Sequence, residues 1–156
     1  MFAHETIDEA AQAAAGRIDV NDVDELRQVL QPWDVVLRQM SSGKLHARID
    51  YVQVNGILLY REHWSHRILG TGATPPGVFL VVGRTSSQSQ ACWCGIELGV
   101  DRLAFARSSA EIDFATPDAE THVCMLVPEG LMLRYLGEQF VMRGLRNEPF
   151  LACANG

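Results

Sequence analysis

Histidines and a glutamate that lie close together are the first residues that could do chemistry. Glu62, His63 and His66 fall in a stretch that reads as a β-strand. Side chains on a strand alternate between its two faces, so His63 and His66, three residues apart, point to opposite sides. A metal site needs three ligands on rigid elements, and His122 is the only later histidine. The spacing disfavours a metal site, and we assign no metal ligand.

The cysteines lack ligand spacing as well. Cys92 and Cys94 are separated by one residue, and no second close pair or histidine pair accompanies them. Neighbouring positions on one strand face are also poor disulfide partners. We therefore predict that these two residues, Cys124 and Cys153 are reduced thiols of the core or the surface.

Motifs for nucleophilic or phosphate chemistry are missing too. No Gly-x-Ser-x-Gly turn occurs, and Cys94-Gly95 has no sign of an adjacent base. Gly70-Thr71-Gly72 lacks the Gly-Lys-Ser/Thr ending of a phosphate loop and is predicted to be a turn. The acidic residues form no pair that indicates acid–base catalysis. The sequence favours binding over catalysis, with no cofactor.

The size and charge of the chain limit its function further. The 156 residues and 17.3 kDa are typical of one compact domain. Nineteen acidic and thirteen basic residues give a net charge of −6, and Lys44 is the only lysine. Binding to a phosphate backbone needs clustered basic residues, so this chain alone is not expected to bind nucleic acid. No run of about 18 apolar residues or signal-peptide pattern occurs, which predicts a cytoplasmic protein without a membrane partner.

The elements that must position these residues fall into three zones. Residues 1–31 read as a helical, acidic arm, with capping patterns that begin at Thr6 and Asp22. Residues 32–128 read as β-structure, because short apolar or alternating runs are separated by turn residues. Asn55-Gly56 is the strongest hairpin signal, since both residues tolerate positive φ. The predicted strands are 35–40, 45–54, 57–64, 78–82, 91–98, 102–106, 112–116 and 122–127.

The third zone, residues 129–156, is predicted to be a helix over Glu129–Arg143 followed by a tail. This helix is apolar around much of its circumference, which predicts burial on more than one side. One side can cover the β-core, and the other can contact a second chain or a missing domain; a single helix in a broad groove of its own domain is the other interpretation. The expected dimer-interface residues are Met132, Leu133, Leu136 and Phe140.

An ordered set of segments resembles the N-terminal sensor domain of AraC/XylS-type transcription regulators. Asp22-Val23-Asp24-Glu25-Leu26, Trp33 and Arg38–Leu45 are similar to the opening of that domain, its "DvDE" helix and "QLspG.f" strand. Four later segments follow in the family's order over residues 20 to 135. They are Gly56–Glu62, Pro75–Phe79, Cys94-Gly95 and Glu111–Pro117. Beside Cys94-Gly95, Trp93 stands one position earlier than the tryptophan of the family's "W.G.el" segment.

The resemblance implies a mainly β, cupin-like jelly roll or barrel with flanking helices that holds a small effector and forms a homodimer. The family's DNA-binding part is a separate C-terminal pair of helix-turn-helix motifs, which this sequence lacks. The chain is therefore expected to be either a cut piece of a regulator or a sensor that stands alone. A pocket would lie inside the barrel. The expected ligand-binding residues are Arg48, Tyr60, Glu62, Phe79 and Trp93, all on predicted strands.

Two other functions stay open. One is a small metal-dependent enzyme on a cupin-like barrel, which would use His63, His66, His122 or Glu62. Metal-binding cupins have two histidines one residue apart, and the absence of that pair counts against it. The other is an interaction scaffold whose barrel is filled by side chains.

Overall fold

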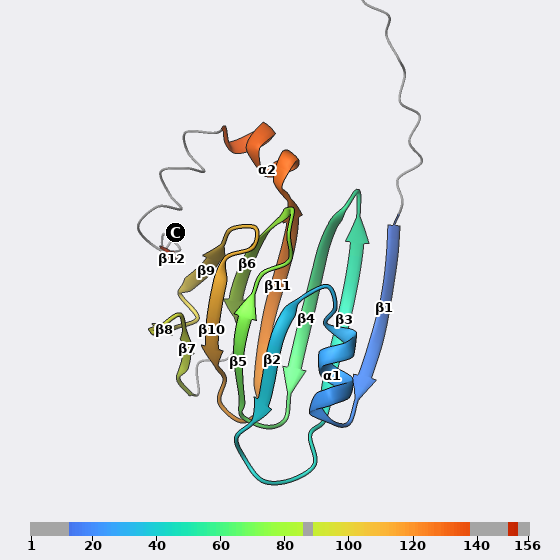
Figure 1. The fold of residues 1–156 in the computed structure, drawn as a ribbon, viewed down its shortest axis with the longest axis vertical. Coiled ribbons are helices and arrows are strands. Elements are labelled where there is room, and N and C mark those ends of the chain that lie inside the picture. The colour runs from blue at the N-terminus through green and yellow to red at the C-terminus, as the bar shows by residue number, and fades with distance from the viewer. Residues whose placement is uncertain (1–12, 86–88, 138–149, 153–156) are drawn as a thin grey trace, which may run out of the picture.

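Two antiparallel β-sheets face each other in the computed structural model of the chain (Figure 1). The structure describes residues 13–85, 89–137 and 150–152. The larger sheet has the strand order β1-β3-β4-β11-β6-β9-β12, and the smaller has the order β2-β5-β10-β7-β8. The expectation of a mainly β, jelly-roll-like fold with flanking helices is confirmed. The strands are β1 (Ala13–Val20), β2 (Asp34–Gln39), β3 (Ala47–Val54), β4 (Ile57–Trp64), β5 (Ile68–Ala73), β6 (Val78–Arg84), β7 (Ala91–Trp93), β8 (Ile96–Leu98), β9 (Arg102–Ala106), β10 (Glu111–Ala115), β11 (Glu120–Pro128) and β12 (Phe150–Ala152).

Local turn chemistry sets the register of the central hairpin. Asn55 and Gly56 have φ values of 50° and 80° and join β3 to β4, as the sequence predicts. β4 then pairs with β11 along its length, and His122 lies directly opposite Glu62. This pairing brings residues 60 positions apart in the sequence into contact.

The expectation that residues 1–31 form a helical arm is partly wrong. Residues 13–20, which include much of the alanine-rich run, form strand β1 at the edge of the larger sheet. Alanine favours a helix in isolation, but here pairing with the whole of β3 overrides that propensity. The capping pattern near Thr6 lies outside the described residues. The division of the chain at residues 31 and 128 stays a prediction.

The helix predicted to begin near Asp22 is confirmed. Helix α1 (Val23–Val29) is capped by the Asp22 side chain, which accepts a hydrogen bond from the Glu25 amide at 2.7 Å. In return, the Glu25 carboxylate accepts from the Asn21 amide. The helix joins β1, on the edge of one sheet, to β2, on the edge of the other (Figure 1). It closes this side of the sandwich, with Leu26 fully buried.

The predicted turn at Gly70-Thr71-Gly72 is wrong, because these residues lie in the middle of β5. β5 pairs with β2 on one side and with β10 on the other. A Cβ at position 70 would overlap the Phe114 ring, and one at position 72 would overlap the Asp34 carbonyl oxygen. These glycines therefore serve close packing within a strand.

The predicted strand 91–98 is instead a short hairpin of β7 and β8. Cys94 and Gly95, at φ 47° and 76°, form its turn. Cys92 and Cys94 are both unpaired thiols, as expected.

The C-terminal helix begins at the predicted residue. Helix α2 (Glu129–Leu136) follows β11 and contacts β6 and β11 (Figure 1). None of its described residues is buried within the single chain, and coverage of its second side by another chain stays a prediction. Leu136 is 43% exposed, whereas Met132 and Leu133 are half-buried. Phe140 and residues 138–143 of the predicted helix lie outside the described residues.

Candidate functional site: a cavity between the sheets

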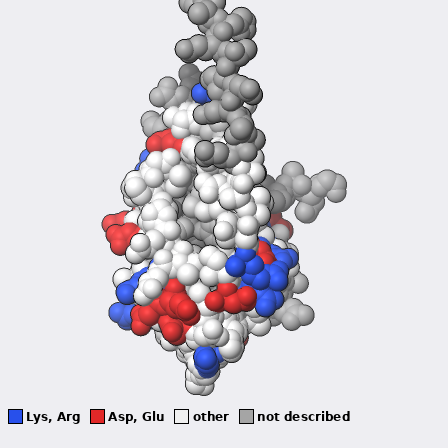
Figure 2. All heavy atoms as spheres, turned by 90° about the vertical axis from the view of Figure 1, so that its right-hand side faces the viewer, with Lys and Arg blue, Asp and Glu red and all other residues white. Residues whose placement is uncertain are grey.

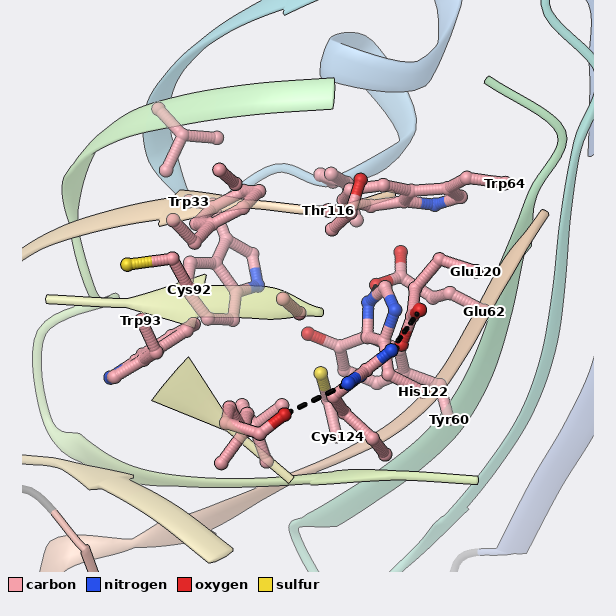
Figure 3. A pocket seen from close by; sticks show the side chains of 18 residues that line it. Trp33, Tyr60, Glu62, Trp64, Cys92, Trp93, Thr116, Glu120, His122 and Cys124 are labelled. Carbon is pink, nitrogen blue, oxygen red and sulfur yellow. Dashed lines mark hydrogen bonds and ion pairs between the residues drawn. The ribbon is translucent and has the colours of Figure 1, made fainter. Parts of the chain in front are cut away.

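A cavity lies between the two sheets at the centre of the described structure (Figure 3). It contains about 590 Å³ of space between atoms, part of it open to solvent. A cavity of this kind can hold a small molecule. Its lining residues are Leu30, Trp33, Val35, Tyr60, Glu62, Trp64, Val82, Arg84, Ala91, Cys92, Trp93, Leu98, Phe114, Ala115, Thr116, Glu120, His122 and Cys124.

One wall of the cavity carries a cluster of polar side chains from β4 and β11. The His122 Nε2 and Glu62 Oε2 atoms lie 2.7 Å apart, and Cys124 follows two residues later on the same face of β11. Burial disfavours protonation of His122, but the nearby Cys124 thiol and the hydrogen bond to Glu62 outweigh it and raise the pKa of His122 to about 10. Burial also raises the pKa of the Cys124 thiol. At neutral pH the cluster therefore contains a protonated His122, hydrogen-bonded to Glu62, beside a neutral Cys124 thiol.

A second buried pair lies next to this cluster. Arg84 of β6 donates two hydrogen bonds to the Glu120 carboxylate, both at 2.8 Å, and a third to the Leu98 carbonyl oxygen. Both side chains are less than 5% exposed. The hydrogen bonds and charge of Glu120 raise the Arg84 pKa although burial opposes this. All of the charge in this part of the cavity is thus neutralised within the protein.

Aromatic rings line the cavity from both sheets, with Phe114 and Trp93 on the smaller sheet and Trp64 on β4, the strand that carries Glu62. Phe114 stacks on Trp93 with centroids 5.9 Å apart, and it also contacts Trp64 at 6.0 Å. Trp64 meets the His122 ring edge-on at 4.8 Å. Within the described ranges, the indole N–H groups of Trp64 and Trp93 are buried without a hydrogen-bond partner. Such groups favour a ligand that combines a flat apolar body with hydrogen-bonding atoms.

Three of the five expected ligand-binding residues lie on this cavity. Tyr60, Glu62 and Trp93 line it, as labelled in Figure 3. Arg48 is exposed on the outer face of β3, where it pairs with Asp19 at 2.9 Å. Phe79 is buried but packs against Phe105 at a centroid distance of 5.6 Å and does not line the cavity. The expectation for these last two residues is wrong, because the strand alternation puts them on the face away from the cavity.

Several cavity residues were not expected from the sequence. Arg84, Glu120 and Cys124 come from strands β6 and β11, and none belongs to a recognised motif. One signal was present: in His122-Val123-Cys124, a one-residue separation on a strand puts both donor side chains on one face. Their partner Glu62 could be identified only from the β4–β11 register.

The outer surface near β1 has a different character. Figure 2 shows acidic and basic side chains next to one another on this side of the molecule. Asp50 on β3 pairs with Arg17 of β1 at 2.5 Å and with Arg61 of β4 at 2.9 Å. Hydrogen bonds from Arg17 and Arg61 lower the pKa of Asp50 to about 2. These charges hold the edge strand to the sheet and lie away from the cavity.

Comparison with known proteins gives one informative match. No protein-family model matches the sequence, and no curated protein matches it. The crystal structure of the AraC-like transcriptional activator CuxR superposes with a TM-score of 0.59, at 15% sequence identity over 78% of this chain. The two chains share a fold. The match covers 51% of the CuxR chain, so this chain spans about half of that protein's length. Among the described residues, no helix is long and apolar enough to cross a membrane.

Proposed function

We propose that the chain is the effector-sensing and dimerisation domain of an AraC-like transcription regulator. The observation that carries this proposal is the central cavity, which lies inside a fold shared with an AraC-like activator. Its wall combines aromatic rings with buried polar atoms that lack partners in the described part of the chain. A bound small molecule would satisfy such atoms, whereas a cavity that only fills a core has no need of them.

The effector we propose is compact and contains an aromatic ring. The stacked Phe114 and Trp93 rings offer a flat surface, and the Trp64 and Trp93 N–H groups can donate to an acceptor on the ligand. No catalytic role is proposed, and the net charge of −6 gives these residues no basis for binding a phosphate backbone.

The test is a thermal-shift screen of one- and two-ring aromatic compounds that carry hydroxyl, amine or carboxyl groups, in the presence of a metal chelator. A ligand at a hundredfold excess over its Kd stabilises the folded state by about 2.7 kcal/mol, which corresponds to a rise in Tm of about 5–10 °C for a domain of this size. Ala91 is buried against the cavity, on the same face of β7 as Trp93, and Ala91→Phe should abolish the shift.

The matched control is Arg48→Ala, because Arg48 is exposed and lies outside the cavity. This variant should keep the full shift. The proposal is contradicted if no compound raises the Tm of the unaltered chain, or if Ala91→Phe retains the shift while remaining folded by circular dichroism.

A further inference from the structure

Three metal-binding side chains lie together on one wall of the cavity. Glu62, His122 and Cys124 each offer one ligand atom, and the three atoms lie within 4.8 Å of one another. Figure 3 shows these side chains side by side, with Cys92 on the other side of the cavity. We propose that they bind a divalent transition-metal ion of the zinc class.

Strand pairing fixes the three ligands in place. Glu62 on β4 is the direct cross-strand partner of His122 on β11, and Cys124 follows on the same face of β11. β4 and β11 are neighbours within the seven-stranded sheet, with paired strands on both of their outer sides. All three residues are at least nine-tenths buried, with exposed fractions of 3%, 7% and 4%. The ligands therefore come from a rigid part of the fold, as a metal site requires.

Atoms without partners provide an independent reason for a bound group. The Glu62 Oε1 and His122 Nδ1 atoms are buried and have no hydrogen-bond partner in the part of the chain that the structure describes. Buried polar atoms in folded proteins are nearly always paired, and a pair of exceptions within one cluster indicates a missing partner. A metal ion between the carboxylate, the imidazole and the thiolate would engage the whole cluster.

The distances need only a small adjustment. Around a four-coordinate zinc ion with bonds of about 2.0–2.3 Å, neighbouring ligand atoms are about 3.3–3.8 Å apart. One ligand atom from each residue already lies within 4.8 Å of the others, so rotation of the side chains brings them towards this spacing. Cys124 would bind as the thiolate and His122 as the neutral imidazole, and each would release one proton to solvent.

The type of ligand atoms selects the class of metal. One sulfur, one nitrogen and one carboxylate oxygen form a mixed set that suits Zn²⁺ and Co²⁺, whereas Mg²⁺ and Ca²⁺ require oxygen ligands. Three protein ligands leave a fourth position for water or a donor atom of a bound molecule. An entry path exists, because Leu30, Trp33 and Cys92 line the same cavity and are half-buried.

The proposed metal site lies in the same cavity as the proposed effector site, but metal binding does not depend on effector binding. Metal binding and effector binding are measured separately, since the effector screen contains a chelator. Failure of one therefore leaves the other standing.

The experiment is a titration of the reduced, metal-free full chain with Co²⁺, followed by absorption spectroscopy. We expect one equivalent to give the thiolate-to-cobalt charge-transfer band in the near ultraviolet and the visible bands of a tetrahedral ion. One equivalent of Zn²⁺ should then remove both. Cys124→Ser should abolish the charge-transfer band, and Glu62→Gln should weaken Co²⁺ binding by at least the 10- to 100-fold that loss of a supporting residue costs.

Cys92→Ser is the matched control, because Cys92 is a thiol of the same cavity that does not belong to the cluster. Its spectrum should equal that of the unaltered chain. The proposal is overturned if the unaltered chain gives no charge-transfer band, or if the band persists in Cys124→Ser or disappears in Cys92→Ser. If Cys124→Ser does not fold, the Glu62→Gln titration decides, and unchanged Co²⁺ affinity there rejects the site.

Discussion

At the scale of single residues, the described interior contains charges that are all matched by a partner. Arg84 and Glu120 form a bidentate ion pair, and a third donor of Arg84 reaches the Leu98 carbonyl oxygen. Such a pair contributes little net stability, because desolvation offsets the attraction between the charges. Removing only one of the two side chains lowers the stability strongly, since it leaves an uncompensated charge in the core.

We therefore predict that Glu120→Ala lowers the free energy of unfolding by about 3–5 kcal/mol. The double variant Arg84→Met, Glu120→Leu should recover most of that loss, because neither charge remains. Urea denaturation at pH 7 measures both values. If Glu120→Ala lowers the free energy of unfolding by less than about 1 kcal/mol, Arg84 must reach solvent or another partner once Glu120 is removed, and the prediction fails.

At the scale of elements, the edge strand β1 is the feature that propensity alone does not explain. Its residues are mostly small and exposed, so it buries little apolar surface. Backbone pairing with β3 along eight residues holds it in place. Asp50 adds side-chain contacts, because it joins Arg17 of β1 to Arg61 of β4.

This arrangement predicts a stability that depends on pH. Asp50 has a pKa of about 2 in the folded chain against an ordinary value of 3.8. A lowered pKa means that the folded state favours the charged form, so the stabilisation is complete above about pH 4 and is lost as the pH falls towards 2. Asp50→Asn should therefore be less stable than the unaltered chain at pH 6, and the difference should shrink between pH 4 and 2.

Urea denaturation at several pH values measures this difference. Asp24→Asn is a suitable control, because Asp24 is exposed and its ion pair with Arg27 is stretched to 4.0 Å. A difference for Asp50→Asn that stays constant with pH would contradict the assignment.

At the scale of the whole molecule, helix α2 presents apolar side chains that its own domain does not cover. Tyr135 is 76% exposed and Leu136 is 43% exposed, although the helix contacts β6 and β11. The dimer proposed for this domain would cover them together with Met132 and Leu133. A domain that buries its own helix fully would not require a second chain.

We predict that the chain dimerises through this helix and that Leu136→Glu weakens the dimer at least tenfold, or about 1.4 kcal/mol, because a charge would be buried in an apolar interface. Sedimentation equilibrium across a dilution series measures the dissociation constant. The control is Val100→Glu, since Val100 is 48% exposed and belongs to neither helix. A chain that stays monomeric at high concentration, or equal effects of the two variants, would contradict the prediction.

The sequence by itself determined the features that depend on local chemistry. The turn at Asn55-Gly56, the cap of α1 at Asp22 and the alternation of β4 all follow from neighbouring residues, so short-range rules predict them. Tyr60 and Glu62 are two residues apart on this strand and therefore share one face, and both line the cavity. The sequence did not predict which strand face points inward at Arg48 and Phe79, because only packing against the second sheet defines the inside.

Tertiary structure decided the remaining features. β1 and β5 are strands because long-range partners satisfy their backbone groups, which outweighs the helical preference of alanine and the turn preference of glycine. The cluster of Glu62, His122 and Cys124 exists because β4 pairs with β11 in one register across about 60 residues of sequence. No local pattern contains that register, since it depends on which strands close the sheet. The cavity chemistry of this protein is therefore a property of its fold.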